Sequence, residues 1–229
     1  MMDRSWVNKQ TNAALQSEHD VSRAYVEMLP FGLPYHKERW KNWDCALALH
    51  HTYDTTRFDQ PVLDAGACRD PKYPSPYLPG LQRFGYQLLS GCNLDEGRTE
   101  YEQGIRYEHG DITRLRHGKG HFAFVACLSV IEHGVKTHLF LEEMARVIQP
   151  NGHLFVSFDY WQDPIDTGDR TAFGVPVKIF SRADVVGMVH FAEHHGFELT
   201  GELELGCKDR VVNWLGLEYT FFNLLFRRR

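Results

Sequence analysis

The stretch FAFVACLSVIEHG, residues 122–134, decides the fold. Its first seven residues, Phe122–Leu128, are apolar or small throughout, which is typical of a strand buried on both faces of a parallel sheet. Residues 129–134 then mix small, apolar and polar side chains. An apolar pattern with helical spacing then continues to Ile148 and stops at Pro150-Asn151-Gly152. The stretch therefore predicts a strand, a loop and a helix in succession.

Further short apolar runs on both sides of this stretch predict alternating strands and helices. We expect a helix from Ser75-Pro76 and another from the capping box that starts at Ser181. The expected parallel strands are 62–65, 86–93, 105–109, 122–128 and 153–158, and the expected antiparallel pair is 198–205 with 216–226. The predicted fold is α/β, a Rossmann-like, doubly wound, mostly parallel seven-stranded sheet with a C-terminal antiparallel pair.

Length and composition restrict the class of protein. The chain has 229 residues, which suits a single domain. Residues 1–60 are rich in aromatic side chains and predict a helical N-terminal cap that belongs to the same domain as residues 61–229. The net charge of −5 does not favour a nucleic-acid partner. The longest apolar stretch, 214–226, contains Glu218 and Asn223 and is too short to span a bilayer.

The termini and the cysteines predict a cytoplasmic protein. The first twenty residues lack the apolar core of a signal peptide. The five cysteines form no CxxC pair, and an odd number of unclustered thiols is typical of a reducing compartment.

Ligands of parallel α/β sheets bind outside the carboxyl ends of the strands, and small or polar residues follow four of these ends. After the first strand, Asp64-Ala65-Gly66-Ala67 either lets a ligand approach the backbone closely or forms an ordinary turn. After the second, Asn93-Leu94-Asp95 either holds the hydroxyls of a ribose or caps a helix. After the third, Asp111 either accepts a hydrogen bond from an exocyclic amine or caps a turn. After the fourth, the Glu132-His133 pair favours a functional role.

A family resemblance rests on the ordered set VLDAGA (62–67), GCNLDEG (91–97), GDIT (110–113) and FVACLSVIEHG (124–134), with a helix that ends in IQPNG before HLFVSFDYW. The set resembles the class I S-adenosylmethionine-dependent methyltransferases over about residues 60–226. The resemblance implies S-adenosylmethionine as cofactor, and methyl transfer to an oxygen or nitrogen of a small molecule such as a sugar or secondary metabolite. It is also compatible with a homodimer.

The resemblance assigns cofactor-binding roles by position. Asp64, Ala65, Gly66 and Ala67 would face the methionine end of the cofactor. Asn93 and Leu94 would face the ribose, with Asp95 as the alternative to Asn93, and Asp111 and Ile112 would hold the adenine. Cys127, Leu128 and Ser129 would pass beneath the cofactor. Two departures from the family pattern weaken this assignment. Gly66 is the single glycine of a turn that usually has two, and Asn93 replaces an acid, which removes a charge-assisted hydrogen bond.

His133 is the candidate general base, because an imidazole titrates near neutral pH; the alternative is a structural histidine. Some quinone-pathway methyltransferases add an acid three residues before the Glu-His pair to help hold a metal. That position is Ser129 here, so no metal is expected. The acceptor is expected to contact the aromatic segment 35–43 and the loop 159–180, which would act as a lid.

Two other functions remain open on the sequence. One is a transferase of the same fold that moves a group other than methyl, and the other is a non-catalytic subunit that retains the cofactor fold. A nicotinamide enzyme is disfavoured because no G-x-G-x-x-G follows the first strand.

Overall fold

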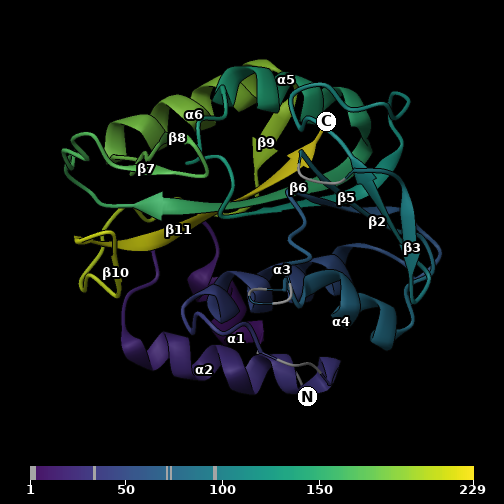
Figure 1. Ribbon diagram of the computed structural model, residues 1–229, viewed down its shortest axis with the longest axis horizontal. Helices are drawn as coiled ribbons and strands as arrows, with labels where there is room; N and C mark the ends of the chain where they lie inside the picture. Colours follow the sequence, from purple (N-terminus) through teal and green to yellow (C-terminus); the bar gives the residue numbers. More distant parts are fainter. Residues whose placement is uncertain (1–3, 33–34, 71, 73, 95–96) are drawn as a thin grey trace.

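The computed structural model describes residues 4–229 except 33–34, 71, 73 and 95–96. A twisted nine-stranded sheet lies at the centre, with helices on both faces (Figure 1). Its strands are β1 (Val62–Ala65), β2 (Leu89–Asn93), β3 (Glu100–Glu102), β4 (Ile105–His109), β5 (Phe122–Leu128), β6 (Ile148–Tyr160), β9 (Phe197–Leu199), β10 (Val212–Trp214) and β11 (Leu217–Arg228). The expected Rossmann-like, doubly wound sheet is confirmed, with more strands than the seven expected.

The strand order is β10-β11-β6-β5-β1-β2-β4-β3, and β9 pairs with the far end of β11. The pairs β4–β2, β2–β1, β1–β5 and β5–β6 are all parallel, so the loops after these strands meet at one edge of the sheet. β11 runs antiparallel to β6 from Thr220 to Arg227. A small separate ribbon, β7 (Thr171–Ala172) with β8 (Val175–Pro176), lies in the loop after β6.

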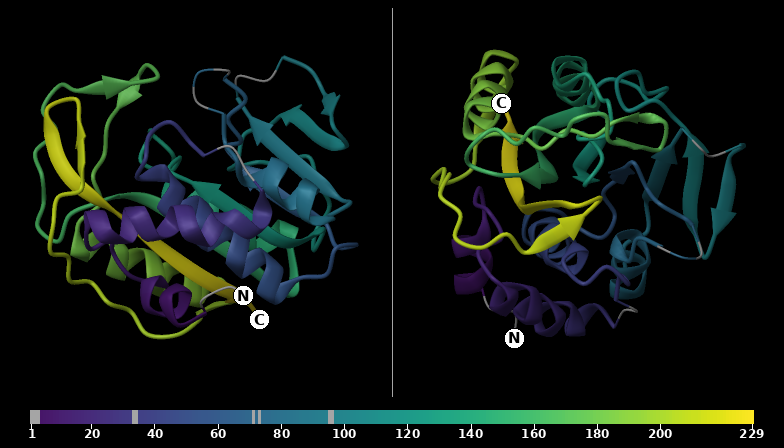
Figure 2. Two further views of the ribbon diagram at one scale, coloured as in Figure 1. Left: turned by 90° about the horizontal axis from the view of Figure 1, so that it is seen from below. Right: turned by 60° about the vertical axis from the view of Figure 1, so that its left-hand side comes forward.

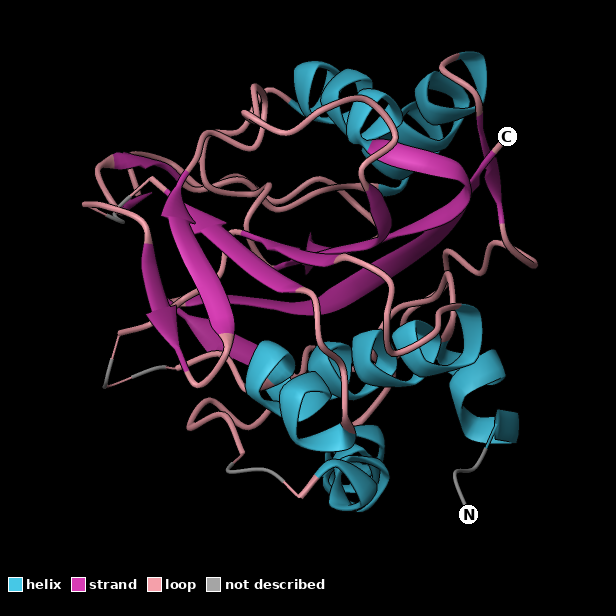
Figure 3. Cartoon of the chain, turned by 90° about the vertical axis from the view of Figure 1, so that its right-hand side faces the viewer, coloured by secondary structure: helices cyan, strands magenta, loops and turns pink. Residues whose placement is uncertain are grey.

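Two layers of helices cover the sheet (Figures 1 and 3). One layer contains α1 (Arg4–Gln10), α2 (Glu18–Met28), the short η1 (Leu29–Phe31), α3 (Lys41–Thr55) and α4 (Tyr77–Phe84), and the other contains α5 (Thr137–Val147) and α6 (Arg182–His194). Every residue of α3 from Asn42 to Thr52 is buried, since this helix lies between the sheet and α2 and contacts β5 and β6. None of the described helices is long and apolar enough to cross a membrane.

The N-terminal segment lies beside β11 (Figure 2) and is hydrogen-bonded to it. The backbone N–H of Asn12 donates to the side-chain oxygen of Asn223 at 3.1 Å, and the Asn12 side-chain oxygen accepts from the backbone N–H of Leu225 at 2.7 Å. The hydroxyl of Thr220 donates to the carbonyl of Leu15 at 2.6 Å. These contacts support our proposal that residues 1–60 and 61–229 form one domain.

Several expected element ends were wrong by a few residues. The helix expected at Ser75-Pro76 begins at Tyr77, and the backbone N–H of Tyr77 donates to the hydroxyl of Ser75 at 3.4 Å, as expected for a serine cap. The capping box of Ser181 with Asp184 is confirmed. β2 begins at Leu89 rather than residue 86. β6 begins at Ile148 rather than residue 153, because the chain stays extended past Pro150 and accommodates Asn151 at a positive φ of 63°.

The expected strand 198–205 was largely wrong. Only Phe197–Leu199 pairs with β11, and the hairpin partner of β11 is β10. The reason is a contact with the N-terminal segment that no local sequence pattern predicts. The backbone N–H of Glu204 donates to the carbonyl of Asn12 at 3.0 Å, so the chain after Leu199 pairs with that segment. All five cysteines have free thiols.

Candidate cofactor and acceptor site

The turn after β1 is held against the end of β2. The backbone N–H groups of Gly66 and Ala67 both donate to the carbonyl of Cys92, at 2.8 and 3.0 Å. The side-chain amide of Asn93 donates to the carbonyl of Ala67 at 3.0 Å. The expected methionine and ribose ends of the site are therefore adjacent, as the parallel pairing of β1 with β2 requires.

Asp64 is a buried carboxylate at the end of β1. Its side chain lies 3.5 Å from the hydroxyl of Ser75 and only 2% of the residue is exposed. Burial raises the pKa of Asp64 to about 7, with a smaller contribution from the charge of Asp44, while Ser75 opposes the shift. A buried carboxylate with so weak a partner is suited to bind a positive charge.

Gly66 adopts a positive φ of 104°, which favours glycine. A Cβ atom at this position would overlap the side chain of Val130. The single glycine of the turn is thus closely packed by the loop after β5. A ligand can approach the Gly66 backbone on this side only after Val130 moves.

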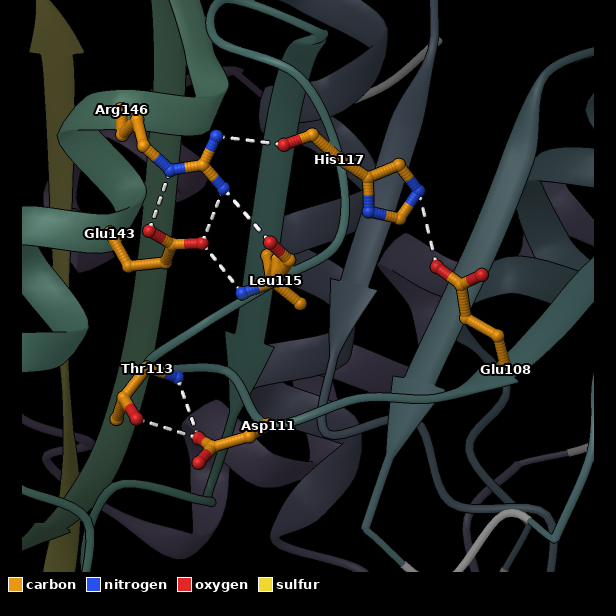
Figure 4. A network of polar contacts seen from close by, with 7 residues as sticks. All are labelled: Glu108, Asp111, Thr113, Leu115, His117, Glu143 and Arg146. Atoms are coloured by element: carbon orange, nitrogen blue, oxygen red, sulfur yellow. Dashed lines mark hydrogen bonds and ion pairs between the residues drawn. The ribbon is translucent and has the colours of Figure 1, made fainter.

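Asp111 accepts two hydrogen bonds within its own loop, from the backbone N–H of Thr113 at 2.8 Å and from the Thr113 hydroxyl at 2.7 Å (Figure 4). This is the turn-capping geometry that the sequence left open as an alternative. The side chain of Asp111 is nevertheless exposed at the strand end, while Ile112 is buried and Leu94 is exposed. Asp95 lies outside the described residues.

The loop that carries Asp111 is held by α5 (Figure 4). Glu143 accepts from the backbone N–H of Leu115 at 2.6 Å. Arg146 pairs with Glu143 and donates to the carbonyls of Leu115 and His117, at 3.0 and 2.7 Å. The imidazole of His117 in turn lies 3.1 Å from the carboxylate of Glu108 in β4. The conformation of this side of the site therefore depends on two charged residues of α5.

Asp44 of α3 joins the ends of β5 and β6. Its carboxylate accepts from the hydroxyl of Ser157 at 2.6 Å and from that of Ser129 at 3.2 Å. Ser129 has a positive φ of 53°, and its backbone N–H donates to the carbonyl of Ser157. Cys127, two residues earlier in the chain and within β5, is fully buried. Sequence reasoning missed Asp44, and the available signal was a carboxylate within an otherwise apolar helix face.

A cavity of about 80 Å³ lies beside this cluster. It combines the two regions expected to hold the acceptor with the β10–β11 hairpin, which the sequence did not suggest. Its lining residues are Glu38, Trp40, Lys41, Glu132, His133, Asp159, Phe173, Val212, Trp214, Tyr219 and Phe221.

Two polar atoms in this lining lack partners. Among the described residues, neither Oε2 of Glu132 nor Nδ1 of His133 has a hydrogen-bond partner, and both atoms are buried. The His133 ring lies edge-on to Phe173 and Trp214, at centroid distances of 5.0 and 6.1 Å. Burial, together with the charge of Lys41, lowers the pKa of His133 to about 4, so its ring is neutral at pH 7.

Burial shifts the pKa values of the neighbouring carboxyl groups upward. Burial raises the pKa of Glu132 well above its usual value, and repulsion by Asp159 adds to the shift. Burial likewise raises the pKa of Asp159 to about 7, against the opposing effects of Lys41 and a hydrogen bond from Tyr219. Within the described part of the chain, no group of three or more His, Cys, Asp or Glu side chains is arranged to hold a metal ion.

A larger cavity, of about 300 Å³, lies beside β4 and is lined by basic residues that include Arg98, Arg106 and Arg116. Glu108 lies in the same lining and pairs with Arg106 at 2.6 Å and with His117 at 3.1 Å. The smaller cavity is the candidate site, because the unpartnered buried atoms of Glu132 and His133 line it.

A family model described as a methyltransferase domain matches residues 85–156, the segment that includes β2, β4, β5 and α5. The resemblance to the class I S-adenosylmethionine-dependent methyltransferases is confirmed. S-adenosylmethionine is the cofactor of this family, as the sequence predicts. No curated protein matches the chain by sequence.

Solved structures support the same methyltransferase fold. An S-adenosylmethionine-dependent methyltransferase from Mesorhizobium loti is 12% identical, with 82% of this chain and 98% of that chain covered and a TM-score of 0.55. The 1,6-didemethyltoxoflavin-N1-methyltransferase of Burkholderia thailandensis, solved with bound 1,6-didemethyltoxoflavin and S-adenosylhomocysteine, is 16% identical, with 94% of this chain and 92% of that chain covered and a TM-score of 0.56. The [4+2]-cyclase SpnF is 13% identical over 93% and 96%, with a TM-score of 0.54. Thus the fold by itself leaves the reaction open.

Proposed function

We propose that the chain transfers a methyl group from S-adenosylmethionine to an oxygen or nitrogen of a small molecule. The observation that carries the proposal is the cavity directly after β5, where the unpartnered buried atoms of Glu132 and His133 lie beside the expected cofactor edge. A small molecule in this cavity would be enclosed by aromatic side chains and bonded at a few polar points, as in most ligand sites.

The residues at the strand ends fit the cofactor in their chemistry. When bound, S-adenosylmethionine supplies an electrophilic methyl group on a positively charged sulfur. The buried carboxylate of Asp64 would bind the positively charged end, and Asp111 with Ile112 would contact the adenine. Asn93 and Leu94 would lie near the ribose, and residues 127–129 beneath the cofactor. Val130 must turn away from Gly66 for this to occur.

The chain's own contribution would be orientation. In an in-line displacement, alignment of the reacting atoms lowers the barrier by ~7–11 kcal/mol. Asp44 fixes Ser129 and Ser157 at the point where the cofactor edge meets the acceptor cavity. His133, the base proposed from the sequence, is neutral and has a ring nitrogen without a partner, although a pKa of about 4 makes it a weak base.

Calorimetry with S-adenosylmethionine and with its demethylated product tests the proposal. We expect both to bind, and Asp64→Ala to weaken binding by about tenfold or more, because a hydrogen bond to a charged group contributes ~1.5–3 kcal/mol. Asp209→Ala, at an exposed position, is the matched control and should bind normally. Absence of binding heat at millimolar ligand would exclude the proposed function.

A non-catalytic subunit with the same fold, or a transferase that moves another group, is the second candidate. The close packing of Val130 on Gly66 and the Asn93–Ala67 hydrogen bond favour it, because both occupy groups that the cofactor would use. A non-catalytic subunit would give no heat with either ligand, whereas a different transferase would bind but release no demethylated product. We also propose a cytoplasmic location and leave the homodimer as an expectation.

A further inference from the structure

The acceptor cavity is lined by three carboxylates from three separate segments. Glu132 follows β5, Asp159 is in β6, and Glu38 precedes α3. Glu132 is 1% exposed and Asp159 is 3% exposed, so water stabilises a negative charge on neither side chain. Burial raises the pKa of Glu132, and repulsion by Asp159 raises it further.

Partners within the chain satisfy these carboxylates only in part. Tyr219 bonds to Asp159, but Oε2 of Glu132 has no partner among the described residues. Lys41 is the cation in the lining, and its ammonium lies 6.0 Å from the centre of the Phe221 ring. A buried carboxylate oxygen that lines a cavity without a partner is costly to the folded chain. Such an atom is suited to bind a positively charged or proton-donating ligand.

The aromatic residues of the lining also favour a positively charged ligand. Five aromatic side chains, Trp40, Phe173, Trp214, Tyr219 and Phe221, contribute to one small cavity. The faces of aromatic rings attract cations, most strongly when the site is shielded from water. A carboxylate ligand would instead meet three acidic side chains and one lysine. An alcohol would find acceptors but would gain nothing from the rings' attraction for charge.

Resting on the proposed function, we propose that the acceptor is a small amine, and that Glu132 and Asp159 bind its ammonium group and take the proton that it must lose. The ammonium transfers one proton to the carboxylate pair, which leaves a neutral amine with a free lone pair. The lone pair then forms the new N–C bond while the S–C bond of the cofactor breaks and its electron pair stays on sulfur. The product leaves as the methylated ammonium.

This assignment gives the proton-accepting role to the carboxylate pair instead of His133. The charged and titratable groups that face the pair are Lys41 and Asp44 of α3, Glu38 before it, His133 after β5 and Tyr219 of β11. The pKa of Asp159 is raised to about 7, so the pair loses negative charge as the pH falls. Ammonium binding should therefore strengthen between pH 6 and pH 8.

Three probes of similar size and different charge test the proposal: benzylamine, benzyl alcohol and benzoate. Their binding is measured by calorimetry on the full chain in the presence of S-adenosylhomocysteine. We expect benzylamine to bind at least tenfold more tightly than either other probe. Glu132→Gln and Asp159→Asn should each remove this preference, whereas Glu193→Gln, at an exposed position of α6, should keep it.

The unmodified protein provides a second measurement in case a variant does not fold. Its affinity for benzylamine, which stays protonated, should rise by about tenfold from pH 6 to pH 8, following ionisation of a group with a pKa of about 7. Equal affinity for benzylamine and benzyl alcohol, or tighter binding at pH 6, would overturn the amine assignment. If S-adenosylhomocysteine itself fails to bind, the proposed function fails instead.

Discussion

Replacing Asp64 with asparagine should change how the stability of the chain depends on pH. The pKa of this buried carboxyl is raised from 3.8 to about 7, mainly by burial. The folded state therefore holds the proton over a pH range in which the unfolded chain has released it. The free energy of unfolding then falls as pH rises from about 4, and the loss is complete above about 7.

The magnitude follows from the two pKa values. One pKa unit corresponds to ~1.4 kcal/mol, so ionised Asp64 destabilises the fold by about 4 kcal/mol at pH 8. About 1.5 kcal/mol of this is already present at pH 5, which leaves about 2.5 kcal/mol between pH 5 and pH 8. Asparagine has nearly the same shape and no charge, and it should remove that part of the decline.

Urea unfolding of both proteins at pH 5 and pH 8 measures the effect. We expect the unmodified chain to lose about 2.5 kcal/mol more than Asp64→Asn over this range. Asp209→Asn, which is exposed, is the matched control and should behave like the unmodified chain. An equal decline in Asp64→Asn would refute the reasoning, because the proton held at neutral pH would then belong to another group.

Three further changes test other parts of the site. Gly66→Ala should lower the free energy of unfolding by about 3 kcal/mol, because a side chain is strained at φ 104° and overlaps Val130. In urea unfolding, adding Val130→Ala to this variant should recover part of the loss. Arg146→Ala should lower the free energy of unfolding by about 2 kcal/mol in the same assay, since two backbone carbonyls lose a charged donor. An unchanged midpoint would show that the network drawn in Figure 4 does not stabilise the fold. His133→Ala should lower turnover ~100-fold if the imidazole removes the acceptor's proton. If the carboxylates remove it, His133→Ala should lower turnover less than Glu132→Gln does. A lower melting temperature with full turnover would indicate a structural role for His133.

The sequence predicted the centre of the fold well, because hydrophobic pattern and strand-end chemistry are local. The run Phe122–Leu128 and the capping box at Ser181 were both placed correctly. The failures involve partners distant in sequence. The segment 198–205 reads as a strand, yet Asn12 takes one of its hydrogen bonds, and no local pattern encodes that contact.

The same distinction applies to the candidate site. Asp64, Gly66 and Glu132 were identifiable because each lies at or just after the end of a predicted strand. Asp44 was not, because its role depends on two serines 85 and 113 residues further along the chain. The state of His133 was also inaccessible, since its pKa depends on how deeply the loop is buried.

The position of β11 has a consequence for how the chain acquires its structure. This last strand lies between β6 and β10 in the sheet and also binds the N-terminal segment. During synthesis, residues 148–160 leave the ribosome before residues 217–228, so one edge of β6 has no partner strand until β11 has been made. An exposed strand edge promotes association between chains. Since Tyr219 and Phe221 of β11 also line the proposed acceptor cavity, the nascent chain gains its protection from aggregation and its proposed ligand site in the same late step.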